Sequence, residues 1–144
     1  MHETLDTIRR VLLAILIIGL AGTATELLLL DHDEEAIQLV PLALIVIAFV
    51  AIVWHTLDQG SASVRLLQIV MVLFIVAGVL GMVLHYRANV DFQREVDPSI
   101  AGWALFIKAV KAKAPPALAP GTMAQLGLLG LAYAYRYPSR RRQS

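Results

Sequence analysis

Long apolar runs separated by short polar interruptions dominate the chain, and this pattern predicts its elements. A membrane-spanning helix needs about 20 predominantly apolar residues, and four segments reach or approach that length. We expect spanning helices at residues 11–30, 36–57, 64–84 and 117–135. Runs such as LALIVIAFVAIV are continuous, whereas the strands of a membrane barrel alternate apolar and polar residues. The pattern therefore predicts an all-α membrane protein.

The first two interruptions are short and predict tight turns. Residues 31–35 and 58–63 leave room for little else, so the first three segments should run antiparallel to one another. In the second turn, Gly60 suits a left-handed helix cap, and Ser63 suits the N-cap of the next helix.

The third interruption, residues 86–116, is much longer. Within it, Asp97 and Pro98 resemble a helix N-cap followed by proline at the first helical position. Apolar residues then recur at helical spacing, namely Ile100, Trp103, Ile107 and Val110. We predict an amphipathic helix over residues 98–113 that lies in the membrane interface, with Trp103 at headgroup level. Its final lysines, where the helix dipole favours cations, are Lys108, Lys111 and Lys113.

Composition supports this class of protein. Of the 144 residues, 58% are hydrophobic and only 16% are charged, against about a quarter charged in soluble domains. We expect one polytopic membrane domain over residues 1–144, a bundle of four transmembrane helices with one interfacial helix between the third and fourth. The charged leader and apolar core resemble a signal peptide. Because the apolar run resumes at residues 27–30, we expect an uncleaved first span instead.

The positions of lysine and arginine predict the orientation. With the N-terminus inside, seven of the 12 basic residues face the cytoplasm, and the turn at residues 31–35 carries none. We therefore expect both termini in the cytoplasm of a bacterial inner membrane, with the basic tail, residues 136–144, near anionic lipid. A net charge of +1 gives no reason to expect a nucleic-acid partner.

Three helix faces repeat the same spacing of small residues. Each set places its members three and then four residues apart, on one helix face. The sets are Gly19, Gly22 and Glu26; Gly78, Gly81 and His85; and Gly127, Gly130 and Ala134. Since glycines let helices approach closely, we predict that these faces pack against other helices, within the chain or in another chain.

An ionisable side chain at membrane depth is costly and marks a candidate functional site. If the glycine faces of the first and third helices meet, Glu26 and His85 become partners in the outer half of the membrane. We predict a ligand-binding or proton-binding cluster there, formed by Glu26, His85, Gln38, Gln125, Thr23 and Tyr86. The alternative is that these groups only join helices by hydrogen bonds. His85 and His55 also fit the description of ordinary interfacial residues.

Metal and cofactor sites have weaker support. His32 with Asp31, Asp33 and Glu35 has the composition of a cation site, but adjacent residues cannot all face one ion. By the predicted topology, His55 and His85 lie near opposite surfaces and cannot clamp one haem. Cysteine is absent, as are a phosphate-binding loop and the common hydrolase motifs. We expect no cofactor, and haem or a divalent metal stays a minor alternative.

Three classes of function follow from these predictions. We favour a small non-enzymatic accessory or assembly subunit, present as a homo-oligomer or in a larger membrane complex. The first alternative is a protein that binds or transports a small ligand, lipid or ion through the outer cluster. The second is a membrane enzyme or a metal or haem protein.

Overall fold

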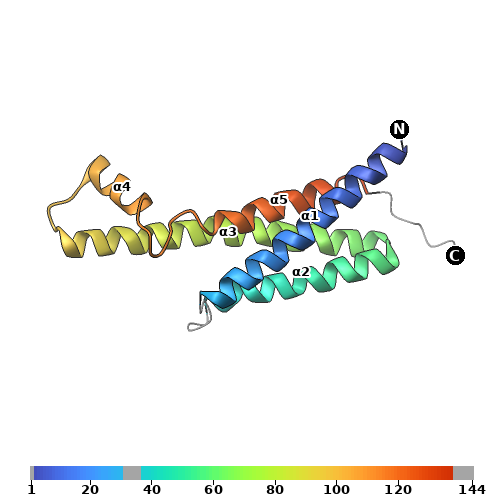
Figure 1. Cartoon of the computed structure of the whole chain (residues 1–144), viewed down its shortest axis with the longest axis horizontal. Coiled ribbons are helices and arrows are strands. Elements are labelled where there is room, and N and C mark those ends of the chain that lie inside the picture. The colour runs from blue at the N-terminus through green and yellow to red at the C-terminus, as the bar shows by residue number, and fades with distance from the viewer. Residues whose placement is uncertain (1, 31–36, 138–144) are drawn as a thin grey trace.

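The computed structural model describes residues 2–30 and 37–137, and within these ranges the protein is built from helices (Figure 1). The metal-site prediction at His32, Asp31, Asp33 and Glu35 lies outside the described residues, as does most of the basic tail. The helices are α1 (His2–Leu29), α2 (Leu39–Asp58), α3 (Ser61–Val96), α4 (Gly102–Val110) and α5 (Gly121–Ala134).

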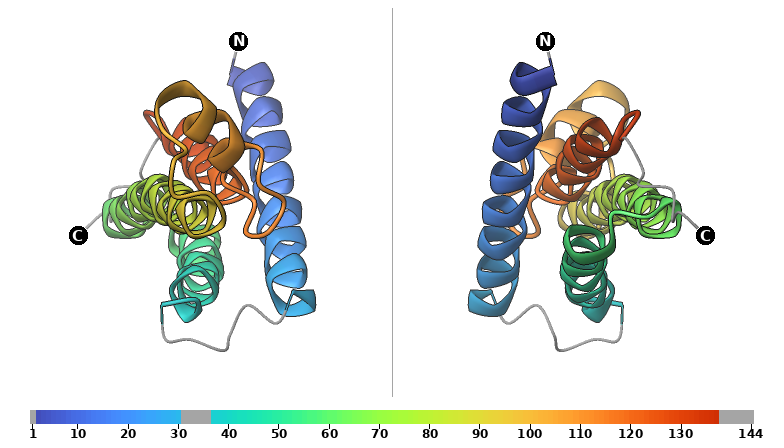
Figure 2. Two further views of the ribbon diagram at one scale, coloured as in Figure 1. Left: turned by 90° about the vertical axis from the view of Figure 1, so that its left-hand side faces the viewer. Right: turned by 90° about the vertical axis from the view of Figure 1, so that its right-hand side faces the viewer.

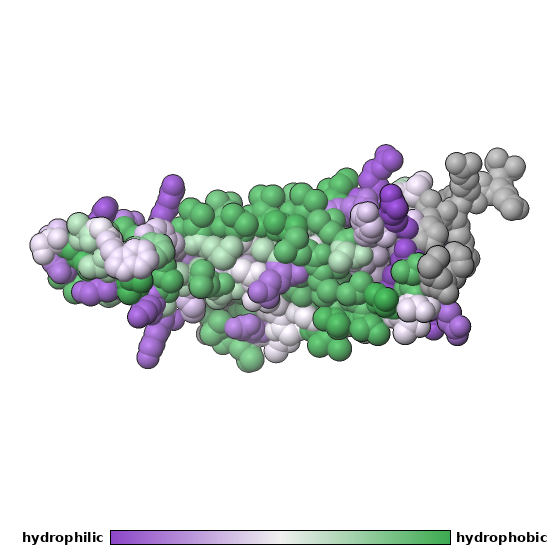
Figure 3. Space-filling model, turned by 90° about the horizontal axis from the view of Figure 1, so that it is seen from above, coloured by the Kyte–Doolittle hydropathy of each residue, from purple (hydrophilic) through white to green (hydrophobic). Residues whose placement is uncertain are grey.

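Among the described residues, α1, α2 and α3 are long and apolar enough to cross a membrane. These helices make the chain an all-helical protein of the integral membrane class. Figure 3 shows a hydrophobic band over the middle of the molecule, with hydrophilic side chains gathered toward both ends. A few hydrophilic patches interrupt the band on the face in view.

The turn between α2 and α3 is tighter than the sequence pattern indicated. Gln59 adopts the left-handed conformation, with φ of 49°, while Gly60 is extended and precedes α3. Ser63 lies inside α3 and donates a hydrogen bond to the Gly60 carbonyl (2.9 Å). A Cβ at Gly60 would lie 2.5 Å from the Asp58 carboxylate, so a larger residue there would require the Asp58 side chain to move. The predicted capping roles of Gly60 and Ser63 are therefore wrong.

Helix α3 is much longer than its predicted span. Its 36 residues extend over about 54 Å at 1.5 Å per residue, whereas the hydrocarbon core of a bilayer is about 30 Å thick. The helix passes the predicted end at residue 84 and stops at Val96, before Pro98. The first part of the predicted long connection is thus helical, and α4 lies beside this far end of α3 (Figure 1).

The amphipathic helix predicted over residues 98–113 is shorter, Gly102–Val110. The Asp97 carboxylate does not begin a helix. It accepts hydrogen bonds from the Ser99 hydroxyl (2.6 Å) and the Ser99 amide (3.1 Å), which form a local turn. Helix α4 can start only beyond this turn.

Helix α5 spans 14 residues, about 21 Å, and begins after a turn that ends at Pro120. It is shorter than the fourth span predicted at residues 117–135. It packs on both α1 and α3 and lies between them (Figure 2). The core cluster draws on α1, α2, α3 and α5 around Leu16, Ile52, Phe74 and Leu126.

The glycine faces of α1 and α3 pack on α5 and its start rather than on each other. A Cβ at Gly19 would lie 2.5 Å from Leu126 of α5, and one at Gly78 would lie 2.6 Å from the Ala124 amide nitrogen. Gly81 contacts Pro120 in the same way, whereas Gly22 has open space around it. Because α5 separates α1 from α3, the two glycine faces do not bring Glu26 to His85.

Candidate functional site

The residues predicted for the outer cluster fall into two groups, and the first group points outward. Glu26 on α1 and Gln125 on α5 are exposed, and Thr23 is partly exposed. Gln38 immediately precedes α2, is partly buried and makes contacts of its own. Glu26 and Gln125 therefore belong to the outer surface of the bundle.

The second group belongs to the hairpin formed by α3 and α4. The Nδ1 atom of His85 lies 2.9 Å from the Pro116 carbonyl; since a carbonyl only accepts, Nδ1 donates. Tyr86 packs near the ring of Phe106, with centroids 6.0 Å apart. These contacts position the chain that connects α4 to α5.

Asn89, one turn beyond His85, completes the anchoring of this connection. It is 1% exposed, and its side-chain amide donates to the carbonyls of Ala109 (3.1 Å) and Pro115 (2.9 Å). A buried donor needs a partner to offset its desolvation. Asn89 thereby fixes α4 against α3 with both amide hydrogens used.

A second polar cluster lies at the other end of the bundle, around His55 of α2. His55 is 1% exposed, so its side chain is enclosed by the bundle, while its predicted position near the membrane boundary stays a prediction. Its Nδ1 atom lies 3.5 Å from the Ser63 hydroxyl. The rings of Tyr133 and Tyr137 meet the imidazole edge-on, with centroids at 5.6 Å and 4.5 Å.

Arg9 of α1 and Gln68 of α3 join this cluster to the chain after α5. The Arg9 guanidinium donates to the Arg136 carbonyl (3.2 Å) and lies 5.2 Å from the centroid of the Tyr137 ring. The Gln68 side chain donates to the Ala134 carbonyl (3.2 Å), which belongs to the last turn of α5. Helices α1, α2 and α3 thus each contact residues 133–137.

The sequence does contain a signal for this cluster. His55 continues the helical spacing of Ala48 and Ile52, both of which are buried. Trp54, its neighbour, lies on a different face and is 42% exposed. The burial of His55 follows from its face of the helix rather than from its closeness to a membrane boundary.

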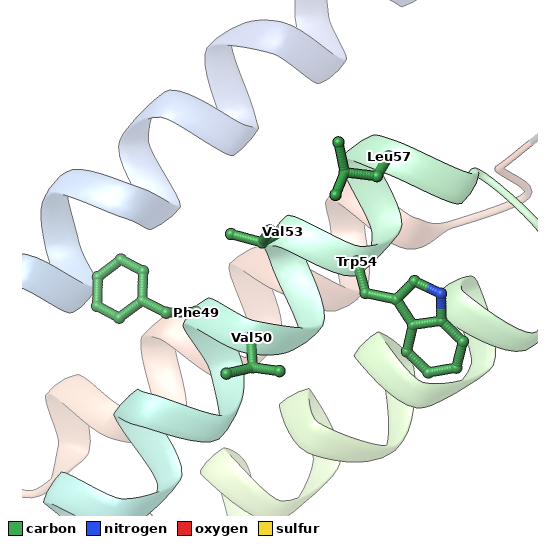
Figure 4. Close-up of a pocket in the computed structure, with 5 residues that line it drawn as sticks. All are labelled: Phe49, Val50, Val53, Trp54 and Leu57. Carbon is green, nitrogen blue, oxygen red and sulfur yellow. The ribbon is translucent and has the colours of Figure 1, made fainter.

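Two shallow hollows lie on the surface of the described part of the chain, and one of them, on α3, includes the polar residues Arg65 and Gln68. The other hollow, on α2, is lined by apolar residues of that helix alone: Phe49, Val50, Val53, Trp54 and Leu57 (Figure 4). Such a surface suits an acyl chain or another helix. The described residues contain no group of three potential metal-ligating side chains.

No protein-family model, curated protein or solved structure matches the chain.

Proposed function

We propose that the chain is a non-enzymatic accessory or assembly subunit of a membrane complex, and that α1 forms its docking surface for another transmembrane chain. The observation that carries this proposal is the exposure of Glu26 on an apolar helix. Glu26 lies in the last turn of α1, which ends at Leu29, and a charged side chain in a spanning helix costs up to about 2.5–3.5 kcal/mol, the value for the helix centre on insertion scales. A partner that supplies a hydrogen-bond donor would offset much of that cost.

The surroundings of Glu26 suit close contact with another helix. The exposed residues that precede Glu26 in the last turns of α1 are small, namely Ala21, Gly22 and Thr25, whereas large exposed leucines follow it. A Cβ built at Gly22 would meet nothing within 4 Å, so the chain itself does not use this notch. Small residues spaced four apart allow helix backbones to approach in a membrane. We call the exposed face formed by Ile18, Ala21, Gly22, Thr25 and Glu26 the docking surface.

Helix α1 is also poorly covered by the rest of the chain. Only 11% of its most apolar window is buried, compared with 28% for α2 and for α3. Ile18 is 71% exposed and Leu29 is 78% exposed. Lipid would cover these apolar side chains adequately, whereas Glu26 requires a polar partner.

The arrangement in the bilayer that we propose keeps four spans. Helices α1, α2 and α3 cross the membrane, and α5 with its flanking residues forms a short fourth span. Both termini lie in the cytoplasm of a bacterial inner membrane, and α4 lies next to the outer surface with its lysines near lipid headgroups. The complex contains further copies of this chain or other membrane subunits, and it needs no cofactor and no catalytic residue.

Variants at Glu26 test the proposal through the association of the chain in lipid nanodiscs. Glu26→Leu removes the polar group and should weaken association about 3- to 30-fold, which corresponds to 0.6–2 kcal/mol for a hydrogen bond between membrane helices. Glu26→Gln retains hydrogen bonding and should associate nearly as the wild type does. Equal association of the wild type and Glu26→Leu would refute this docking surface. Loss of function in Glu26→Gln with intact association would indicate a ligand-binding role instead.

A further inference from the structure

His55 is enclosed at the end of the bundle where α2 turns into α3. Its side chain is among the most completely buried in the described part of the chain, and it touches residues from two other elements. Ser63 of α3 lies on its Nδ1 side. Tyr133 of α5 and Tyr137, just beyond α5, pack edge-on against its ring.

The contacts around His55 indicate which ring nitrogen carries the hydrogen when the imidazole is neutral. The Ser63 hydroxyl donates its hydrogen to the Gly60 carbonyl, so toward His55 it can act only as an acceptor. Nδ1 must then carry a hydrogen, and in a neutral imidazole Nε2 carries the lone pair. This Nε2 atom is buried and has no hydrogen-bond partner among residues 2–30 and 37–137.

A proton that bound to Nε2 would create a buried cation without an acceptor. The Asp6 carboxylate is 3.9 Å from Arg9, and the Asp58 carboxylate lies against Gly60 in the turn. The Arg9 guanidinium lies over the ring of Tyr137, and that ring in turn contacts the ring of His55. At this end of the bundle, the charged and titratable groups on the elements around His55 are Glu3, Asp6, Arg9 and Arg10 of α1, Asp58 of α2, Arg65 of α3, and Tyr133, Tyr135, Arg136 and Tyr137 at and beyond the end of α5. Desolvation therefore opposes the charged form of His55.

Tyr137 is the connection that such a charge would disturb. Its ring lies 4.5 Å from the His55 ring of α2 and 5.2 Å from the Arg9 guanidinium of α1. Helices α1 and α2 approach each other near residues 29 and 39 and diverge toward the opposite end (Figure 1). At that diverging end, Tyr137 bridges the two helices.

We propose that His55, Tyr137 and Arg9 form a proton-sensitive latch. With His55 neutral, the latch holds the N-terminal part of α1 against the bundle. When His55 binds a proton at Nε2, Tyr137 is released and the N-terminal part of α1 moves away from α2. This proposal is independent of the docking surface around Glu26, because it concerns the opposite end of α1.

Spin-label distance measurements in lipid nanodiscs test the latch. The sequence contains no cysteine, so Leu5→Cys and Leu57→Cys introduce the only labelling sites, both at exposed positions on α1 and α2. Between pH 8 and pH 5, the label distances should shift to a longer, broader distribution. As the pH falls, the ratio of open to closed molecules should rise by at most tenfold for each pH unit, because only one proton is bound.

Three variants make the result decisive. His55→Gln should remove the pH response, and His85→Gln, a histidine at the far hairpin, should keep it. Tyr137→Ala should give the open distribution already at pH 8, which tests the latch without altering His55. A wild type insensitive to pH, or a response unchanged by His55→Gln, would overturn the proposal.

Discussion

Asn89 is the polar residue on which the hairpin of α3 and α4 depends most. Asn89→Leu would leave the carbonyls of Ala109 and Pro115 without their present donor. Unpaired buried polar groups cost about 1–3 kcal/mol each. We expect faster hydrogen exchange at the α4 amides, with the amides in the middle of α3 unchanged. Gln93→Leu, one turn further along α3, is the matched control, and equal exchange in both variants would contradict this role of Asn89.

Asp97 gives the hairpin a dependence on pH. Hydrogen bonds from the Ser99 hydroxyl and amide hold the pKa of Asp97 below its ordinary value of 3.8. A carboxyl whose pKa is lowered by folding stabilises the fold above the ordinary value, and this contribution is lost as the pH falls through the lowered one. Ser99→Ala should therefore raise the pKa of Asp97, measured by NMR titration of its carboxyl carbon. A pKa as low in Ser99→Ala as in the wild type would show that the hydroxyl does not matter.

At the scale of single residues, the sequence draws attention to Glu26, whereas the burial of His55 and Asn89 was not predicted. Glu26 is conspicuous because it interrupts an apolar run. Asn89 lies among charged residues that suggest a solvated loop, and its burial depends on α4 folding back over it. Such long-range contacts leave no local pattern in the sequence.

Close helix packing through glycine should be directly measurable at α3 and α5. A Cβ at Gly78 would lie 2.6 Å from the Ala124 amide nitrogen and 2.8 Å from the Pro120 carbonyl, so the α5 backbone would have to shift. We expect Gly78→Ala to destabilise the protein by about 1–3 kcal/mol, the usual cost of overpacking. Thermal unfolding in detergent measures this effect. Gly22→Ala is the matched control because its Cβ enters open space. If Gly78→Ala and Gly22→Ala unfolded at comparable temperatures, the packing of α3 on α5 would be contradicted.

At the scale of elements, continuous apolar runs were sufficient to predict three helices that could cross a membrane. The ends of the helices were less predictable. Helix α3 extends to Val96 because no proline or glycine interrupts residues 82–97, and polar residues continue a helix as readily as apolar ones. Helix α5 begins later than expected because the turn ending at Pro120 precedes it. Hydrophobicity reports depth in a membrane, whereas local backbone chemistry decides where a helix stops.

At the scale of the whole molecule, the position of α5 was the feature that the sequence could not supply. Three glycine faces predicted close helix contacts, but the spacing of residues does not say which face meets which helix. With α5 between α1 and α3, Glu26 is directed away from the bundle core and His85 joins the α4 hairpin. The residues predicted to form one outer cluster are thus divided between exposed positions on α1 and α5 and the hairpin of α3 and α4.

The oligomeric state of the intact protein, extracted directly from its membrane into polymer nanodiscs, tests the central claim. Native mass spectrometry should find more than one polypeptide per disc for the wild type. Gly22→Ile, which fills the notch beside Glu26, should reduce this to a single chain, while Ala43→Ile, at an exposed small residue of α2, should leave the assembly intact. A wild type that is strictly a single chain, or a Gly22→Ile variant that assembles as the wild type does, would contradict docking through α1.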